Sequence, residues 1–349
     1  MSLTAFKIPK GTSNALRRVI DDLPIPQWEV QSVNMNTSLS PELVKRTLEN
    51  LFVPLPSTLS DLNRWLENGG YGEMIGGSDR RVSNNQERKP FPVLRLSLDV
   101  KSDVAMRVVK TSDCLFADGH LKQPLENPYS LDLEILSMGF GQSIQVSAES
   151  VFGPPRFGIT IATKSHTRPI VSKAPSAASS AAKAPQPTHV ELVIESYPGG
   201  TSEKDILLMA MRILILKLYS VQEQLEQMLR LNANIEGIET GGAFVVNDTD
   251  KHTIPLLLIE YMQRDPTVAY CGTDLMTLNG PPCYKLMYRM SDPKYSIYGA
   301  LTTAIQAIVS DMRAIQAMNR LSEGSTEGED IAAPFMGDLR VAVKSGSGR

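Results

Sequence analysis

The amino-acid sequence predicts an α+β fold built as an intramolecular pseudo-dimer, in which two related units pair through long helices. Three observations favour this fold. A short helix followed by a strand is expected near the N-terminus and again far downstream. Each half of the chain ends in a long helix with a continuous apolar face. The first half also contains a stretch of turn residues and short alternating runs, which predicts an inserted β-rich domain.

The first copy of the repeated plan begins close to the N-terminus. Thr12 or Ser13 can cap a short helix there, a proline turn follows at Pro24, and residues 30–35 alternate as a strand. Downstream, residues 253–259 predict a short helix that ends at Asp265-Pro266, and residues 268–271 predict the strand that follows it. Two copies of one plan in a single chain indicate two units that pair with each other.

The two long helices are predicted over about 201–230 and about 294–320. Their apolar residues alternate at steps of three and four, which is typical of helices that pair along a seam. Two matched seams in one chain cover each other more simply than they cover a second molecule. The residues predicted to form this helix-pairing core are Leu207, Leu214, Leu218, Val221, Leu225, Tyr298, Leu301, Ile305, Ile308 and Met312.

The division of the chain follows from changes in composition. Residues 173–187 are almost entirely Ala, Ser, Pro and Lys, which predicts a flexible linker. The segment after Leu321 is rich in Ser, Gly and Glu, which predicts a mobile tail. The expected parts are a larger unit of residues 1–56 and 188–230, an inserted β-rich domain of residues 57–172, the linker of 173–187, a smaller unit of 231–321 and the tail of 322–349.

Composition limits the class of function. The chain is 42% hydrophobic and 21% charged, which is ordinary for a globular protein, and no apolar run approaches the roughly 20 residues of a membrane span. The N-terminus lacks a signal-peptide pattern, so we expect an intracellular protein without membrane contact. A formal charge of −3 argues against strong direct binding of nucleic acid. Three cysteines, Cys114, Cys271 and Cys283, lack metal-ligand spacing.

No motif predicts a catalytic, cofactor-binding or metal-binding residue. The glycine-rich stretch 69–77 lacks the Lys-Ser/Thr pair of a phosphate-binding loop. His252 precedes a helix, which favours a capping or packing role. An enzyme with a site around Asp113, Asp118 and His120 is a further interpretation, but a polar turn explains these three residues better.

The first copy carries a family resemblance. The run from Asn14 to Val19, followed by Val33 to Ser38 and then Glu42 to Leu55, resembles the start of the larger α-like subunit of multisubunit RNA polymerases. This family includes the N-terminal domain of bacterial α, its larger archaeal counterpart of the D type and the third-largest subunit of eukaryotic polymerase II. More weakly, residues 140–161 are similar to the hairpin of the inserted domain of this family.

The second copy resembles the smaller partner, which is the L-type polymerase subunit of archaea or its eukaryotic equivalent. The matching runs are residues 250–254, 256–258 and 265–272. Family members tend to have Gly-Asn where this chain has Pro255-Leu256. Because proline in the first turn of a helix costs no hydrogen bond, we expect this helix to form nevertheless.

The resemblance implies two α-like dimerisation domains in one chain, and hence a non-catalytic assembly subunit of a DNA-directed RNA polymerase that docks the two largest subunits. Small zinc-bearing polymerase subunits are further implied partners. A fusion of both units is similar to what large cytoplasmic DNA viruses encode, which implies viral transcription in the host cytoplasm and presence in the virion. The residues expected to bind partners, as exposed positions on two short helices, are Asn14, Arg17, Arg18, Lys45 and Arg46.

One alternative belongs to another class of protein. The same seams could join two molecules of a homodimeric viral structural or interaction protein. The position of the two long helices in one chain distinguishes the two interpretations, because a seam that is covered internally is not open to a second molecule.

Overall fold

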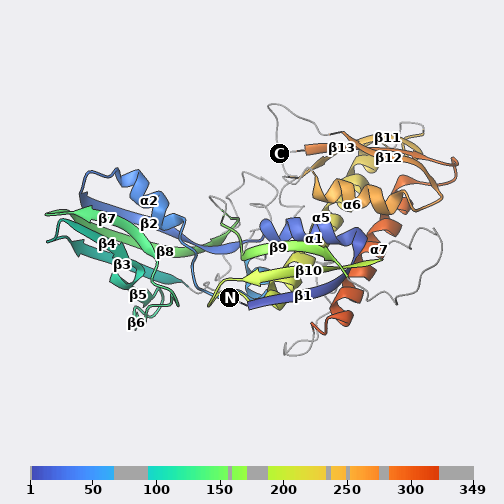
Figure 1. Cartoon of the computed structure of the whole chain (residues 1–349). Helices are drawn as coiled ribbons and strands as arrows, with labels where there is room; N and C mark the ends of the chain where they lie inside the picture. The colour runs from blue at the N-terminus through green and yellow to red at the C-terminus, as the bar shows by residue number, and fades with distance from the viewer. Residues whose placement is uncertain are drawn as a thin grey trace, which may run out of the picture.

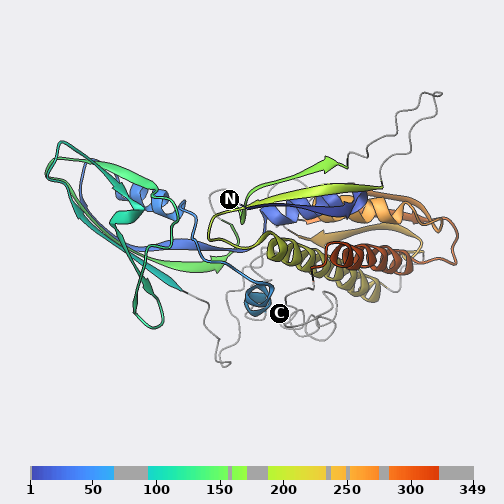
Figure 2. The same ribbon diagram turned by 60° about the horizontal axis from the view of Figure 1, so that its bottom comes forward.

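The computed structural model describes residues 2–66, 93–155, 159–170, 188–232, 237–248, 252–274 and 283–321, and the fold is α+β with antiparallel sheets. The molecule has two lobes (Figures 1 and 2), one that contains the long helices and one that is mainly sheet. The predicted linker of 173–187, the predicted tail of 322–349 and the glycine-rich stretch 69–77 lie outside the described residues.

The helical lobe contains two units with a three-stranded antiparallel sheet each. In the first unit the strand order is β1-β10-β9. In the second it is β11-β13-β12. The elements of the first unit are β1 (Ser2–Pro9), α1 (Lys10–Asp21), β9 (Ala162–Pro169), β10 (His189–Ser196) and α5 (Glu203–Leu231). Those of the second unit are β11 (Gly241–Asn247), α6 (Thr253–Met262), β12 (Val268–Asp274), β13 (Cys283–Met290) and α7 (Ile297–Met318).

The two sheets share one arrangement. In each, the strand that precedes the long helix (β10 or β13) is central, and the strand that precedes the short helix (β1 or β11) lies at one edge. The third strand occupies the other edge, as β9 in the first unit and β12 in the second. The second unit reaches β12 directly after α6, whereas the first unit reaches β9 only after the whole sheet lobe.

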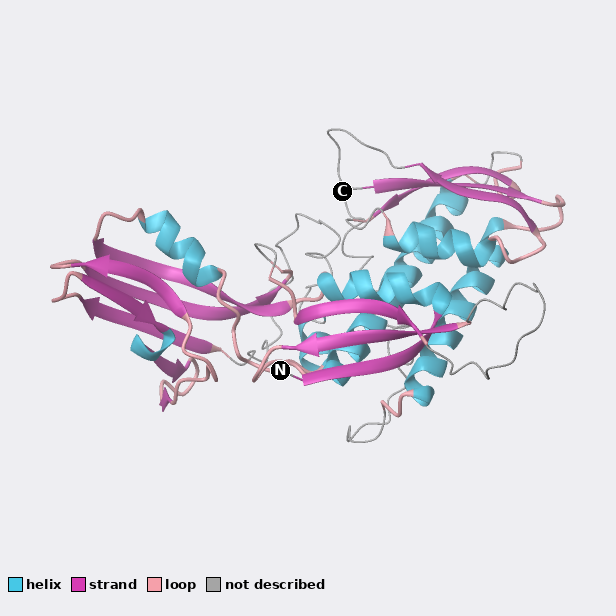
Figure 3. Cartoon of the chain, viewed as in Figure 1, coloured by secondary structure: helices cyan, strands magenta, loops and turns pink. Residues whose placement is uncertain are grey.

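The sheet lobe is built on a five-stranded sheet of order β2-β8-β3-β5-β6, with a two-stranded ribbon of β4 and β7 (Figure 3). Helix α2 packs on β2 and contacts β7. A separate helix, α3 (Leu59–Trp65), packs on α5 in the helical lobe. The elements of the sheet lobe are β2 (Ile25–Asn36), α2 (Pro41–Glu49), β3 (Leu94–Lys101), β4 (Met106–Lys110), the short 3₁₀ helix η2 (Thr111–Asp113), β5 (Cys114–Asp118), β6 (Pro124–Leu125), β7 (Glu134–Gly139) and β8 (Ser143–Gly153).

Each lobe has its own hydrophobic core. The core of the helical lobe takes in side chains from both three-stranded sheets and from α1, α3, α5, α6 and α7. The core of the sheet lobe contains Trp28, Val44, Leu48 and Leu96, among others. Strand β2 joins the two, because Ile25 at its start belongs to the first core and Trp28 three residues later belongs to the second.

The cores divide at other residues than the sequence predicted. Strand β2 and helix α2 were expected in the larger unit, but β2 pairs along its length with β8 and α2 packs on it. Residues 57–172 were expected as the insertion, yet α3 and β9 belong to the helical lobe. A twelve-residue strand long enough to pass from one core to the other explains the shift, since it carries a domain boundary within itself.

The starts of three helices show how far local sequence determines where a helix begins. Ser40 Oγ accepts a hydrogen bond from the Leu43 N–H at 3.1 Å at the start of α2. Helix α6 forms with Pro255 in its first turn. The cap predicted for α1 is wrong, because the helix begins at Lys10. The hydroxyl of Thr12 instead donates back to the Pro9 carbonyl at 3.2 Å.

Candidate interface between the two units

The predicted helix-pairing residues lie in one core. Nine of the ten are at most 1% exposed, and Tyr298 is partly buried at the edge of the same core. Helices α5 and α7 contact each other directly, since Gln222 Nε2 on α5 donates to Thr302 Oγ1 on α7 at 2.9 Å and to the Tyr298 hydroxyl at 3.3 Å. The two long helices therefore meet within a single chain.

Helix α5 is buried more completely than a paired seam requires. From Ile206 to Leu218 every residue is buried, so its apolar surface extends around the whole helix. Helix α7 covers only one side, and α1 covers another. The expectation that the two seams mainly cover each other is corrected here: α5 is a central helix, because residues between the predicted seam positions are apolar as well.

Four helices close a ring of contacts. Helix α1 contacts α5, α5 contacts α7, α7 contacts α6, and α6 contacts α1. Each unit thus packs its short helix on its own long helix, while the short helices meet and the long helices meet across the junction. Gly11 permits the approach of the short helices, since a Cβ there would lie 2.9 Å from Arg264 Nη2 and 3.3 Å from the Tyr261 hydroxyl oxygen.

Two carboxamide side chains make matching contacts in opposite directions. Gln224 on α5 accepts from the Asn247 N–H at 2.8 Å and donates to the Asn247 carbonyl at 3.3 Å, at the end of the edge strand β11. Asn319, at the end of α7, accepts from the Lys7 N–H and donates to the Lys7 carbonyl, both at 2.9 Å, in the edge strand β1. Each long helix therefore binds the edge strand of the other unit.

A buried ion pair also crosses between the units. Lys217 Nζ on α5 lies 3.3 Å from Asp248 Oδ1, just after β11, and the two side chains are 3% and 4% exposed. A buried charge that loses its partner is costly, so this pair holds its two segments in one register. The sequence analysis missed it, although a single lysine in the apolar run of α5 was a visible signal.

The predicted partner-binding residues fall on two separate surfaces. Asn14, Arg17 and Arg18 form one stripe on α1, where Asn14 is exposed and both arginines are half-buried. Lys45 and Arg46 lie on α2, in the other lobe (Figures 1 and 2). The structure does not bring the two groups together.

Most of these cations have acidic neighbours on their own helices. Arg17 Nη1 lies 3.7 Å from Asp21 Oδ2, and Lys45 and Arg46 form ion pairs of the same i,i+4 type with Glu49 and Glu42. Arg18 forms no ion pair with any residue in the described ranges. It is therefore the cation of this set that a partner carboxylate could most readily pair with.

The trio of Asp113, Asp118 and His120 does not converge. Asp113 and Asp118 stand at opposite ends of strand β5, which is roughly 13 Å long at about 3.3 Å per residue. Asp118 Oδ1 accepts from the N–H groups of His120 and Leu121 at 2.8 and 2.7 Å, and these bonds lower the pKa of Asp118. The predicted polar turn accounts for this arrangement.

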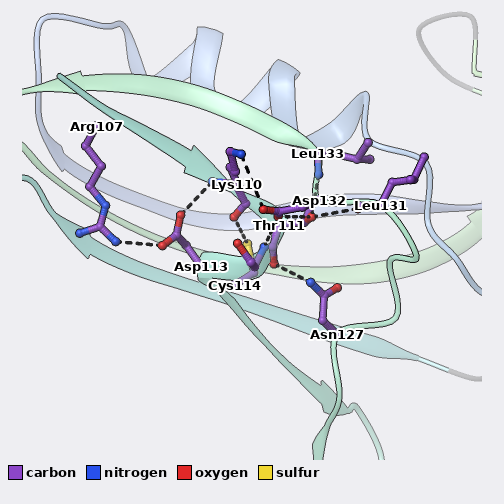
Figure 4. A network of polar contacts seen from close by, with 10 residues as sticks. Arg107, Lys110, Thr111, Asp113, Cys114, Asn127, Leu131, Asp132 and Leu133 are labelled. Atoms are coloured by element: carbon purple, nitrogen blue, oxygen red, sulfur yellow. Dashed lines mark hydrogen bonds and ion pairs between the residues drawn. The ribbon is translucent and has the colours of Figure 1, made fainter.

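Asp113 belongs instead to a network that ties η2 to residues 127–133 (Figure 4). Its carboxylate pairs with Arg107 at 2.8 Å and accepts from the Lys110 N–H at 2.9 Å. Asp132 accepts from the Ser112 N–H at 2.9 Å, and this bond is the main reason that its pKa is lowered. Since these carboxylates already accept backbone hydrogen bonds, the network fixes the local chain path.

The described ranges contain no cluster of three or more His, Cys, Asp or Glu side chains able to hold a metal ion. All three cysteines are free thiols. Burial raises the pKa of Cys114 to about 12, with the charges of Asp113 and Asp132 adding to it, and burial raises the pKa of Cys271 to about 11. Both thiols are therefore protonated at neutral pH. Within the same described ranges, no helix has the length and apolar character to span a membrane.

Comparison of the chain with models of known protein families gives no match, and comparison with curated proteins gives none either.

Proposed function

We propose that the chain is a non-catalytic assembly platform of a multisubunit DNA-directed RNA polymerase, which docks the two largest, catalytic subunits. The proposal combines the sequence resemblance of both halves to α-like subunits with one observation, the reciprocal binding of each edge strand by the long helix of the other unit. Contacts that repeat in both directions are typical of a two-fold dimer interface. Here both partners belong to one polypeptide.

A pseudo-dimer of two α-like domains is supported further by the order of the elements. Both units place a short helix after an edge strand and a long helix after the central strand. Short helix meets short helix, and long helix meets long helix. We therefore infer that the two units are copies of one plan, with the sheet lobe inserted into the first.

Such a junction suits a platform because its two units share one core. The apolar side chains of α5 and α7 and the buried Lys217–Asp248 pair join the units. The two copies differ in sequence, so they offer two related but unequal surfaces to two different large subunits. On α1, the stripe of Asn14, Arg17 and Arg18 is the surface we propose for one of them. Small zinc-bearing subunits are further proposed partners, on the resemblance alone.

The rival interpretation, a homodimer joined through the same seams, requires apolar seams that are exposed in one molecule. The seam residues of α5 and α7 are buried within the single chain, which favours internal pairing. On the resemblance to fused viral subunits, we propose that the protein serves viral transcription in the host cytoplasm and is carried in the virion.

Co-expression tests the proposal. The tagged full chain is produced together with the two largest polymerase subunits of the same source and purified by the tag. We expect all three chains to be recovered in equal amounts, and the chain alone to incorporate no nucleotide. Recovery without either large subunit, or nucleotide incorporation by the isolated chain, contradicts the proposal.

The α1 stripe is tested in the same experiment. Arg18→Glu should reduce recovery of one large subunit by about tenfold, because a reversed charge repels the carboxylate that arginine would pair with. Lys101→Glu, an equal charge change on an exposed residue of the sheet lobe, is the matched control and should leave recovery unchanged. Equal effects of both variants would mean that the stripe has no specific role.

A further inference from the structure

The outer faces of the two three-stranded sheets, which point away from the helices, carry opposite charge patterns. On the central strand of the first unit, the outward residues are Glu191, Val193 and Glu195. At the matching places on the central strand of the second unit stand Lys285, Met287 and Arg289. An apolar residue is thus flanked by two acids in one sheet and by two bases in the other.

On the first face, acids and bases on neighbouring strands stand opposite each other. Arg168 Nε on β9 lies 2.6 Å from Glu191 Oε2. Lys164, also on β9, stands directly opposite Glu195 in the register. Lys7 on β1 stands opposite Glu191 from the other side. Cross-strand neighbours of opposite charge attract each other, so each glutamate of this face has at least one base opposite it within the sheet.

The second face differs in the pairing of its cations. Neither Lys285 nor Arg289 forms an ion pair with a residue in the described part of the chain. Asp274 stands opposite Lys285 in the register but makes no ion pair with it. Burial raises the pKa of Tyr288, the residue before Arg289, and the negative charge of Glu239 adds to this rise. The two cations therefore remain available at the two ends of the face.

The centre of the second face is apolar and exposed. Val245 is 46% exposed and Tyr270 is 49% exposed. Gly272 makes room for the tyrosine, because a Cβ at this position would collide with the Tyr270 hydroxyl oxygen. The ring therefore lies along the strand, over Gly272 and beside Met287, which is opposite Gly272 in the register. Exposed apolar side chains that are gathered and rimmed by charge are typical of interaction sites.

We propose that the outer face of β11-β13-β12, formed by Ala243, Val245, Tyr270, Lys285, Met287 and Arg289, binds an extended acidic and apolar segment of a partner protein. The partner's apolar side chains cover Val245, Tyr270 and Met287, and its carboxylates pair with Lys285 and Arg289. The site rests on the proposed function only in that a large polymerase subunit would supply this segment. The first sheet does not bind it, because Val193 at the centre of the same face is 2% exposed and both glutamates of that face stand opposite bases.

A synthetic peptide provides a direct probe. A fluorescein-labelled twelve-residue peptide of alternating Glu and Leu is titrated with the purified full chain, and its anisotropy is recorded. Binding should weaken by about tenfold in Lys285→Glu/Arg289→Glu and at high salt, because both changes remove the attraction between opposite charges. A peptide of alternating Lys and Leu should not bind.

The matched control reverses two charges on the first sheet. Lys7→Glu/Lys164→Glu makes the same total charge change on exposed side chains and should bind the acidic peptide as the wild type does. Thermal melting checks that both variants fold. Equal loss of binding in both double variants, or no loss in either, would overturn the proposal.

Two further outcomes separate this inference from the proposed function. If the peptide binds as expected but no large subunit is recovered on co-expression, the face is supported and the polymerase role is not. If the subunits are recovered equally with wild type and with Lys285→Glu/Arg289→Glu, and the peptide does not bind, the face is rejected while the platform role stands. Self-association of the chain that is abolished by the same variant would show that a second copy occupies the face, which also overturns the proposal.

Discussion

The helical lobe joins the two ends of the described chain, whereas the sheet lobe is built from strands and a helix within residues 25–153. In the helical lobe, Lys7 bonds to Asn319, 312 residues away, so both ends of the described chain meet there. In the sheet lobe, the hydrogen bond between Ser32 and Ser147 spans 115 residues, and the one from Ser112 to Asp132 spans 20, but all these residues lie between β2 and β8. The first lobe therefore cannot form until both units exist, whereas much of the second can form from its own residues.

This difference teaches which part of the molecule carries the pairing of the units. The inserted lobe has its own core and its own local network, so changes in it leave the junction intact. The lobes meet through β2, through the stacking of Phe52 on Tyr197 at 4.1 Å between ring centroids, and through the edge contact of Trp65 with Phe152 on β8. These are places where a change in one core can reach the other. The two tryptophans lie one in each core, Trp65 with the helices and Trp28 with the sheet, so fluorescence can follow the lobes separately.

The largest effect is expected from the buried ion pair. Lys217→Met removes the ammonium group that lies 3.3 Å from the buried Asp248 carboxylate, which should lower the free energy of unfolding of the helical lobe by about 3–5 kcal/mol. The loss is measured by denaturant unfolding in a Trp28→Phe background, in which Trp65 fluorescence alone reports the unfolding of the helical lobe.

Removal of the second charge should restore much of that loss. In Lys217→Met/Asp248→Asn the buried carboxylate charge is removed together with the ammonium group, so the double variant should be more stable than Lys217→Met alone. A double variant that is as unstable as the sum of both single variants would show that the two side chains act independently.

A matched pair of core truncations tests whether the lobes are independent. Leu214→Ala in α5 and Leu96→Ala in β3 each remove a side chain at most 1% exposed, and each should cost about 2–5 kcal/mol. Leu214→Ala should shift only the unfolding transition reported by Trp65, and Leu96→Ala only the one reported by Trp28. If either variant shifts both transitions equally, the two lobes unfold as one unit and the comparison fails.

The sequence predicted the elements of the helical lobe well because strong local signals define them. The alternating apolar steps of α5 and α7 act within a few residues, as do the signals for the short helix α6 and for the strand β12 that follows it. Periodicity could not show that α5 is central, because that depends on which other elements pack on it.

Pairing between distant strands was harder to predict. Residues 30–35 were matched to residues 268–271 as equivalent strands, but β2 pairs with β8 in the sheet lobe, and β9 takes the place that β12 has in the second unit. Among the site residues, Gln224 and Asn319 act on backbone groups far away in the chain. No local pattern marks a carboxamide for that role, so these contacts become visible only in three dimensions.

The reciprocal contacts should have equal, smaller effects. Gln224→Ala and Asn319→Ala each remove two hydrogen bonds to an edge strand that lies near solvent, so each should cost about 1 kcal/mol. Both losses of stability are measured as shifts of the denaturant unfolding transition that Trp65 fluorescence reports. The control is Gln145→Ala, which removes an exposed hydrogen bond of 3.0 Å from Gln145 Nε2 to Asp99 Oδ2 in the sheet lobe. This variant should leave the Trp65 signal unchanged. A large loss from only one of the two variants would mean that the junction is not built alike in both directions.

The smallest effect concerns pH and belongs to the sheet lobe alone. The pKa values of Asp118 and Asp132 are lowered from 3.8, mainly by hydrogen bonds from backbone N–H groups. A carboxylate whose pKa is lower in the folded state stabilises it above pH 3.8, and this contribution is lost as the pH falls through the lowered values. The midpoint of the Trp28 transition should therefore fall between about pH 4 and about pH 2.

Asp118→Asn/Asp132→Asn keeps an acceptor oxygen at each site but removes the titration, so its midpoint should fall less over the same range. Identical pH profiles for the variant and the wild type would show that these two carboxylates do not stabilise the lobe, and an equal change in the Trp65 signal would show that the effect is not confined to it.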